Sequence, residues 1–314
     1  MKNTLLRLII ISNIVVISLS IICSCQELGI GIKGSITRTQ EKPVTSLIPD
    51  SNNTLTLMNW NIQSFGKTKW GKPDVKQEIL RIIPKADIIF IQEIRDKSGE
   101  AFKELCRELN QTHKCNISSR AGRTSYKEQY GIIYRKEIQL LDIQDYNPDS
   151  GDRWERPPVK TIFKTIFNHT GYILTAYNIH TKPRNATIEI KRLEEFVTGK
   201  TENNMKNNTE KNKTSTQNIA VLGDLNADCY YYNAEQEEDF AAPEWKWVIQ
   251  NQDDTTTSSY SDCAYDRIII NQDASQEYLR YGIYMNITGE TSDHYPVWVE
   301  IKPQKTKPLG IASQ

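Results

Sequence analysis

Acidic and amide side chains recur at the carboxyl ends of apolar segments, and they are the first candidates for chemistry. They are Asn61, Glu93, Asp224 and Asn226. In layered α/β proteins, binding and catalytic sites form where the carboxyl ends of several strands meet. Carboxylate and amide oxygens suit Mg²⁺ or Mn²⁺, which also bind water and phosphate oxygens. Any one of these residues could be a turn or cap residue, but together they favour a metal site.

Two of the four histidines stand in comparable places. His180 ends an apolar stretch, and His294 follows Asp293 just before the last apolar segment. Imidazoles exchange protons near neutral pH, and phosphodiester hydrolysis needs one group to activate water and another to protonate the leaving oxygen. A lone histidine at a strand end is more often structural, but two beside acidic strand ends fit an acid and base pair. His113 and His169 lie outside this pattern and receive no role.

The elements that must position these residues are mostly strands. Apolar or alternating runs predict strands at 55–61, 87–92, 131–134, 159–167, 172–179, 219–222, 267–270 and 296–301. Helices are expected at 73–83, where proline opens the segment, and near 98–109, 187–198 and 241–250. Many strands and few helices favour two packed sheets flanked by helices over one doubly wound sheet.

Residues 1–26 differ in composition from the rest of the chain. Lys2 and Arg7 precede a long apolar run, and the next charge is Glu27, which is typical of a secretory signal. We therefore expect export to the extracellular space. The stretch could instead stay as a membrane anchor, because its uncharged length approaches the roughly 20 residues that span a bilayer. A lipoprotein-type leader acylated at Cys25 is a further alternative.

One domain is expected over 54–303. Residues 27–53 have scattered Gly, Pro, Ser and Thr without a period and are expected to form a linker, and 304–314 a tail. The tract 199–217 is rich in Asn, Lys, Thr and Glu and has no hydrophobic period, so we expect a flexible surface insertion. A DNA-binding role for its lysines is the less favoured alternative.

The composition indicates a globular domain, but it does not identify what the domain binds. Of the 314 residues 38% are hydrophobic and 25% charged, enough for one large core or two smaller ones. The 39 Lys plus Arg balance 39 Asp plus Glu, so the bulk attraction of a basic nucleic-acid binder to a polyanion is absent. A groove of Arg and Lys opposite an acidic metal site would give the same net charge.

The number of cysteines is informative about whether the protein lies in an oxidising compartment. Beyond the leader the chain has Cys106, Cys115, Cys229 and Cys263. An even number in an exported chain suggests two disulfides, with three pairings open. Four buried thiols are the alternative, which export disfavours.

Short segments in a fixed order carry a family resemblance. They are NWNIQSFG at 59–66, IQEIRD at 91–96, GRTSYKEQY at 122–130, GDLNADC at 223–229, CAYDRI at 263–268 and SDHYPV at 292–297. In this order, from about Leu55 to Ile301, the chain resembles the deoxyribonuclease I family. GDLN and SDH alone would indicate only the wider endonuclease/exonuclease/phosphatase superfamily, whereas GRTSYKE and CAYDRI are much more specific and point to the deoxyribonuclease I branch.

The resemblance implies an α/β (α+β) fold, a four-layered α/β/β/α sandwich of two packed, mostly antiparallel sheets. It also implies a metal-dependent endonuclease acting on DNA. Glu93, with Asn61 and Asp293, resembles the metal-binding cluster, for Mg²⁺ or Mn²⁺, with Ca²⁺ as a further candidate. Asp224 and Asn226 resemble the pair that positions the scissile phosphate, the metal and the attacking water.

The family's acid and base are matched by His180 and His294. Each is expected to be held by a carboxylate, Glu128 for His180 and Asp266 for His294. Such a carboxylate fixes the tautomer of the imidazole and raises its basicity.

The family's DNA contacts are matched in part. Arg123 and Tyr126 resemble residues that enter the minor groove, where groove width is read more than base identity. Arg156 resembles a phosphate-contacting arginine, on a looser match. Gln63 stands where the family often has Arg, which would weaken a phosphate contact.

Cys229 and Cys263 fall where the family has a disulfide, so the resemblance implies that bridge. It gives no support for Cys106 with Cys115, whose pairing stays open. The family's structural calcium and actin contacts are not recognisable. No stable protein partner is implied, so we expect a monomer that meets a membrane only through an uncleaved or lipidated N-terminus.

Two other kinds of function compete with this one. The first is another hydrolase of the superfamily: a sphingomyelinase-type lipid phosphodiesterase, an inositol-phosphate phosphatase or the nuclease-like subunit of a distending toxin. Arg123 and Tyr126 discriminate, because a lipid or inositol enzyme needs no minor-groove probe. The second is a catalytically inactive binding homologue, against which the competent residue at every core position argues.

Overall fold

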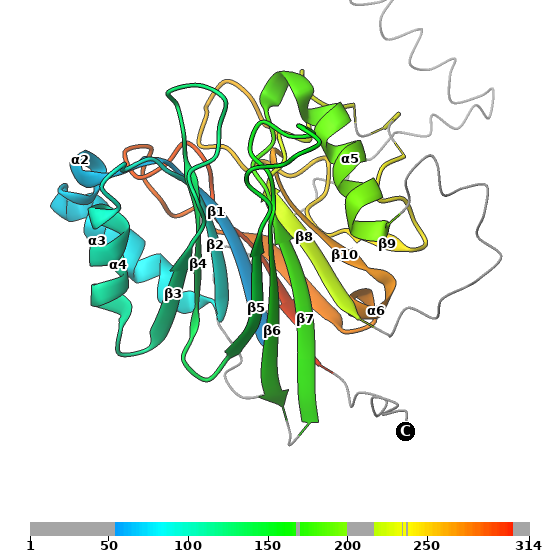
Figure 1. Cartoon of the computed structure of the whole chain (residues 1–314), viewed down its shortest axis with the longest axis horizontal. Coiled ribbons are helices and arrows are strands. Elements are labelled where there is room, and N and C mark those ends of the chain that lie inside the picture. The colour runs from blue at the N-terminus through cyan, green and yellow to red at the C-terminus, as the bar shows by residue number, and fades with distance from the viewer. Residues whose placement is uncertain (1–53, 168–169, 200–216, 234, 237, 304–314) are drawn as a thin grey trace, which may run out of the picture. The chain divides into compact units, whose positions relative to one another are not determined.

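Two six-stranded sheets pack face to face, with helices on their outer faces (Figure 1). This computed structural model describes residues 54–167, 170–199, 217–233, 235–236 and 238–303, within the compact unit 42–314. The expected leader (1–26), linker (27–53) and tail (304–314) lie outside the described residues, as does nearly all of the expected insertion at 199–217. The predictions for these segments stay predictions.

The first sheet has its parallel pair in the middle. Its order is β11 (Tyr278–Ile283), β12 (Val297–Ile301), β1 (Leu55–Phe65), β2 (Ile88–Ile94), β4 (Gln129–Arg135) and β3 (His113–Ile117). Only β1 and β2 run parallel, and the other neighbours are antiparallel.

The second sheet repeats this plan. Its order is β5 (Gln139–Asp145), β6 (Val159–Phe167), β7 (Thr170–Asn178), β8 (Asn218–Asp224), β10 (Asp266–Asn271) and β9 (Trp245–Trp247). Only β7 and β8 run parallel. The expectation of two mostly antiparallel sheets is confirmed.

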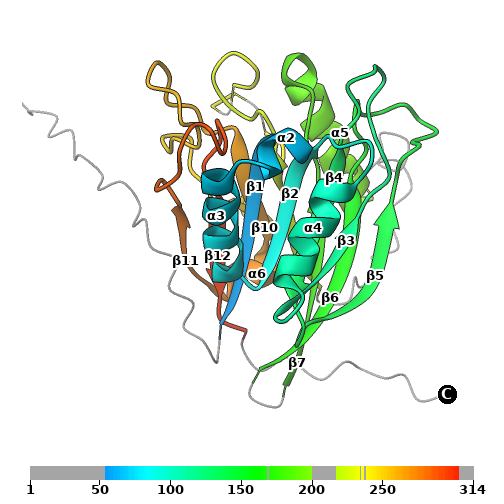
Figure 2. The ribbon, with the colours of Figure 1, turned by 90° about the vertical axis from the view of Figure 1, so that its left-hand side faces the viewer.

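Helices complete the outer layers of the sandwich. The described helices are α2 (Lys67–Trp70), α3 (Pro73–Ile82), α4 (Glu100–Leu109), α5 (Ala186–Thr198) and α6 (Gln272–Ser275), with 3-10 turns η1 (Ile83–Lys85) and η2 (Pro183–Asn185). Helices α3 and α4 lie on the first sheet and α5 on the second (Figures 1 and 2). None of the described helices is long and apolar enough to span a bilayer.

Alternation along the strands divides the core into layers. In β1, Leu55 and Leu57 face the second sheet, whereas Met58 and Trp60 pack in the cluster that includes the apolar faces of α3 and α4. A separate cluster joins α5 to the outer face of the second sheet. The four-layered α/β/β/α sandwich expected from the sequence is therefore the observed one.

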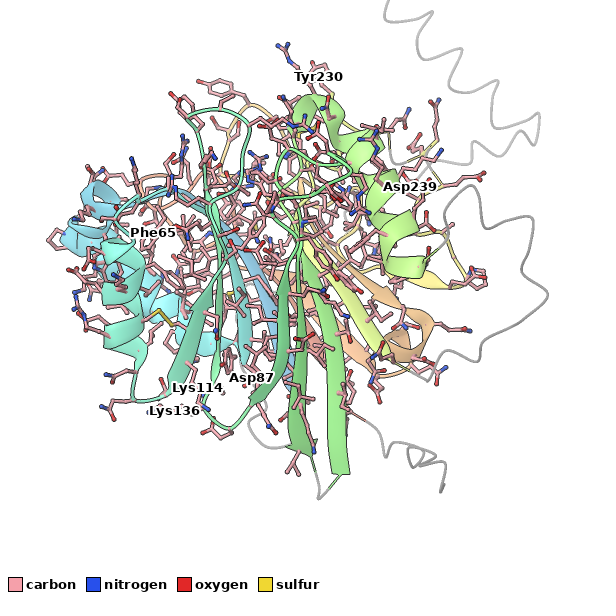
Figure 3. The ribbon with its side chains drawn as sticks, viewed as in Figure 1. Phe65, Asp87, Lys114, Lys136, Tyr230 and Asp239 are labelled. Carbon is pink, nitrogen blue, oxygen red and sulfur yellow. A yellow bond between two sulfur atoms is a disulfide. The ribbon has the colours of Figure 1, made fainter. Side chains whose placement is uncertain are left out.

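The two parallel pairs bring chemistry to one edge. Parallel strands need a crossover connection, which α2 and α3 supply between β1 and β2, and α5 between β7 and β8. β1 and β2 therefore end together, as do β7 and β8, and both pairs end at the edge that lies uppermost in Figure 1. In Figure 3 Tyr230, in the loop after β8, lies at this end, whereas Asp87 and Lys136 lie at the opposite end.

One expected helix is wrong. Residues 241–250 contain the short strand β9, which pairs with β10 through Lys246 and Ile270. Trp245 is buried and Lys246 exposed, a period of two that fits a strand better than a helix. Besides β9, three further strands, β3, β5 and β11, were not expected from the sequence.

Candidate active site

Two histidines face one carboxylate oxygen. Nε2 of His180 lies 3.3 Å from Oδ2 of Asp224, and Nε2 of His294 lies 3.7 Å from the same atom. Nδ2 of Asn61 donates to this oxygen at 3.0 Å. His180 and Asp224 come from the second sheet, whereas Asn61 and His294 lie at strands of the first. The site is therefore built across the junction of the two sheets.

A buried carboxylate holds each imidazole by its other nitrogen. Nδ1 of His180 lies 2.7 Å from Oε1 of Glu128, and Nδ1 of His294 lies 2.6 Å from Oδ2 of Asp266. Because each carboxylate accepts the Nδ1 proton, the Nε2 atoms are the ones turned toward Asp224. The structure thus brings together the two pairs expected from the sequence.

Charge compensation shifts the pKa values of these groups. Burial alone would lower the pKa of His294, but Asp266 and Asp224 outweigh it and raise that pKa to about 10. Burial and Arg156 act to lower the pKa of His180, but Glu128 and Asp224 raise it above its ordinary value. Burial acts to raise the pKa of Asp224, yet the two imidazoles hold it below the usual range. Asp224 is therefore ionised between two basic imidazoles.

Glu93 lies beside this group. Its Oε1 accepts from Nδ2 of Asn61 at 3.3 Å, and its Oε2 accepts from the backbone N–H of Ser64 at 2.8 Å. Glu93 has a φ of 59°, unusual for a residue with a side chain, and such strain concentrates at functional sites. Ligand atoms of Glu93, Glu128 and His180 all lie within 4.8 Å of one another.

Asn226 and Asp293, also predicted as site residues, lie on different sides of the site. Asn226 lies in the site, since its N–H donates to Oδ1 of Asp224 at 3.1 Å. Asp293 lies on the His294 side, where Oδ1 is 3.8 Å from Nε2 of His294 and Oδ2 accepts from Nε2 of Gln63 at 2.8 Å. Among the described residues, the side-chain hydrogen bond and the ion pair of Asp293 join it to Gln63 and His294, not to Glu93.

Arg156 supports the segment that carries His180. Its Nε donates to the carbonyl oxygen of His180 at 2.8 Å and its Nη2 to that of Thr181 at 2.6 Å. Nη1 lies 3.6 Å from Oε2 of Glu128. The guanidinium is thus partly engaged by the protein itself, and its contact with a phosphate stays a prediction.

Arg123 and Tyr126 lie on the loop between β3 and β4. Nη2 of Arg123 pairs with Oδ1 of Asp152 at 2.7 Å, and Tyr126 is 69% exposed. The guanidinium of Arg95 lies over this ring, 4.4 Å from its centroid. We did not single out Arg95 from the sequence, although it stands two residues after Glu93 in a matched segment.

Two disulfides form among the described cysteines. Cys229 pairs with Cys263 at a Cα–Cα distance of 5.9 Å, which confirms the bridge that the resemblance implied. Cys106 pairs with Cys115 at 6.0 Å, the pairing that was left open. The Cys229–Cys263 disulfide ties the loop after Asn226 to the segment that leads into Asp266.

Comparison with known proteins agrees with this geometry. A profile of the Endonuclease/Exonuclease/phosphatase family matches residues 58–294. Deoxyribonuclease-1 of Gallus gallus is 32% identical over 274 residues, which cover 79% of this chain and 93% of the relative. Deoxyribonuclease gamma of Mus musculus is 28% identical over 282 residues, 81% of this chain and 86% of the relative.

Solved structures share the fold at low sequence identity. Humanized TDP2 of D. rerio superposes with a TM-score of 0.56 at 14% identity, covering 80% of this chain and 99% of that one. The catalytic domain of human Nocturnin, with bound sulfate, gives 0.54 at 14% identity, covering 80% and 95%. These two show the fold alone, whereas the family profile and the deoxyribonuclease relatives extend over most of the chain. The chain therefore belongs to the endonuclease/exonuclease/phosphatase family and, within it, to the deoxyribonuclease I family.

Proposed function

We propose that this protein is an exported endonuclease that hydrolyses phosphodiester bonds of DNA with a divalent metal ion. The convergence of His180 and His294 on Oδ2 of Asp224, next to Asn61 and Glu93, carries the proposal. Relatives named Deoxyribonuclease-1 and Deoxyribonuclease gamma support DNA as the substrate. A solved D. rerio TDP2 of the same fold, in complex with a single-strand DNA product, is compatible with it.

The donor set fits Mg²⁺ or Mn²⁺. The carboxylates of Glu93 and Asp224 meet at the amide of Asn61, which gives the hard oxygen ligands that these ions prefer. We assign Glu93 and Asn61 as the residues that hold the ion, with Asp293 as a further oxygen donor. When bound, the ion neutralises phosphate charge that grows in the transition state. Ca²⁺ is a weaker candidate for the same oxygen ligands.

The protein's own residues supply proton transfer and positioning. Glu128 and Asp266 fix the two imidazoles through Nδ1, so both Nε2 atoms are presented to the reacting groups. One imidazole, in its neutral form, accepts the proton of the attacking water, and the other, in its protonated form, donates a proton to the leaving oxygen. Asp224 and Asn226, held to each other by a hydrogen bond, orient the water and the scissile phosphate.

Surface residues and export complete the proposal. The exposed Tyr126 ring, with Arg95 over it and Arg123 on the same loop, is suited to contact DNA in the minor groove. Two disulfides and the leader-like residues 1–26 support an oxidising, extracellular destination. N-terminal sequencing of protein recovered from culture medium would test export and leader cleavage.

Nicking of supercoiled plasmid by the full chain tests the function. We expect cleavage with Mg²⁺ or Mn²⁺, loss on adding a chelator and recovery when excess metal is restored. Sphingomyelin and inositol phosphates serve as alternative substrates. Hydrolysis of one of these without nicking would assign the site to another branch of the superfamily. Failure on every substrate would identify an inactive binding homologue.

A further inference from the structure

Three buried amides form a hydrogen-bonded cluster beneath the site. Asn59 on β1, Gln92 on β2 and Asn178 on β7 are all fully buried. Nε2 of Gln92 donates to Oδ1 of Asn59 at 2.6 Å and to Oδ1 of Asn178 at 3.0 Å. Nδ2 of Asn178 donates to Oδ1 of Asn59 at 3.1 Å. The cluster therefore joins the two sheets by side-chain hydrogen bonds.

The cluster ends on the carboxylate that holds His294. Nδ2 of Asn59 donates to Oδ1 of Asp266 at 3.4 Å, while Oδ2 of Asp266 faces Nδ1 of His294 at 2.6 Å. One oxygen of this carboxylate thus accepts from Asn59 and the other faces His294, while the side chain of Thr255 also hydrogen-bonds to the carboxylate. A donor on one oxygen limits rotation of the carboxylate and keeps the other oxygen aimed at the imidazole.

Each amide also lies just before a site residue along the chain. Asn59 precedes Asn61 by two residues, and Asn178 precedes His180 by two. Because side chains alternate along a strand, residues two apart lie on the same face. Nδ2 of Asn178 further donates to the carbonyl oxygen of Leu222, two residues before Asp224. The cluster is therefore the floor of the site.

Stability does not account for this arrangement. The surrounding core between the sheets is apolar, and burying amides there is unfavourable unless every polar atom is paired. Oε1 of Gln92 is buried without a hydrogen-bond partner among the described residues. Apolar side chains of similar volume would fill the same space without that penalty.

We propose that Asn59, supported by Gln92 and Asn178, is a positioning residue that fixes Asp266 and through it the imidazole of His294. The proposal rests on the proposed function in one respect, that His294 takes part in proton transfer. The orientation of Asp266 and His294 is a separate physical quantity, and it is measurable whether or not DNA is cleaved.

Asn59→Ala tests the proposal, with Leu57→Ala as the matched control. Leu57 lies two residues earlier on the same face of β1, is fully buried in the apolar core and has no side-chain donor that could bind Asp266. We expect Asn59→Ala to lower kcat for DNA nicking roughly tenfold, equivalent to about 1.4 kcal/mol of transition-state stabilisation, with KM nearly unchanged. Leu57→Ala should lower the free energy of unfolding and leave kcat at the parent value. Should Asn59→Ala not fold, Asn59→Ser, too short to reach Asp266, takes its place.

Nuclear magnetic resonance of the full chain with ¹⁵N-labelled histidine supplies the second measurement. We expect the ring resonances of His294 to move in Asn59→Ala and to stay in place in Leu57→Ala. If both kcat and the His294 resonances in Asn59→Ala match those of the parent, the positioning role is refuted. If the parent itself does not cut DNA, the proposed function fails, and the resonances alone decide whether Asn59 positions His294.

Discussion

Gly223 and Ile179 approach so closely that no side chain fits between them. A Cβ atom built on Gly223 would lie 1.7 Å from the carbonyl oxygen of Ile179. Gly223 also has a φ of 156°, a conformation that side chains rarely permit. The next residues along the chain are Asp224 and His180 respectively, so this contact sets the distance between two site residues.

Gly223→Ala should therefore destabilise the fold and abolish cleavage. We expect a loss of about 3 kcal/mol or more, because the clash is with backbone and must separate β7 from β8. Gly199→Ala is the control, since Gly199 also has a positive φ but no described residue within 4 Å of the added Cβ, and the change should cost about 1 kcal/mol. Urea unfolding followed by circular dichroism measures both. Equal losses would show that the close contact contributes nothing.

The sequence predicts the strands that are buried and fails for those at sheet edges. The β2 and β8 runs are apolar because both faces are covered. By contrast β3 and β5 lie at sheet edges, and most of β5 is exposed, so their sequences carry little hydrophobic pattern. Their conformation is set by pairing with β4 and β6, which no local pattern encodes.

The site shows a similar division. Strand-end positions indicate Asn61, Glu93 and Asp224 directly, because parallel strands end at one edge. The pairing of His180 with Glu128, 52 residues away, came only from the family resemblance. Asn59 and Asn178 were missed, because a lone amide inside an apolar strand gives no sign of a partner on another sheet.

His180→Ala and His294→Ala should each abolish nicking while the fold remains. Removal of a general acid or base typically costs 10²- to 10⁴-fold in rate. Plasmid nicking gives the rate, and circular dichroism with urea titration reports the fold. The acid and base assignment is wrong if both variants cut at the parent rate.

Arg123→Ala should weaken DNA cleavage and spare a small chromogenic phosphodiester, because only DNA is long enough to reach the loop. Arg107, whose side chain is 67% exposed on α4 in the outer helical layer, provides a control of equal charge. Arg107→Ala should leave both reactions unchanged. Equal loss on both substrates in Arg123→Ala would remove its role in DNA contact.

Loss of the Cys229–Cys263 disulfide should reduce both stability and activity. Its sequence separation is 34, against 9 for Cys106–Cys115, and loop-closure entropy then gives about 4 and about 2.5 kcal/mol respectively. Replacing each pair with serine and measuring unfolding and nicking separates them. Only the Cys229 and Cys263 variant should lose activity, because that bridge ties the loop after Asn226 to the segment leading into Asp266. Greater inactivation by the other pair would contradict this.

His113 should make the protein less stable as the pH falls. Burial and then the charge of Arg135 hold the pKa of His113 below its ordinary value. The folded state therefore keeps this imidazole neutral, whereas the unfolded chain binds a proton below about pH 6.5. The free energy of unfolding is therefore unaffected by His113 above about pH 6.5. Below that pH it decreases as the pH falls toward the lowered pKa, by at most about 1.4 kcal/mol per pH unit. His113→Leu removes the titrating group. In urea unfolding from pH 8 to pH 5, the free energy of unfolding of the variant should therefore rise relative to that of the parent as the pH falls. A difference in stability that stays constant over this range would show that His113 does not titrate with unfolding.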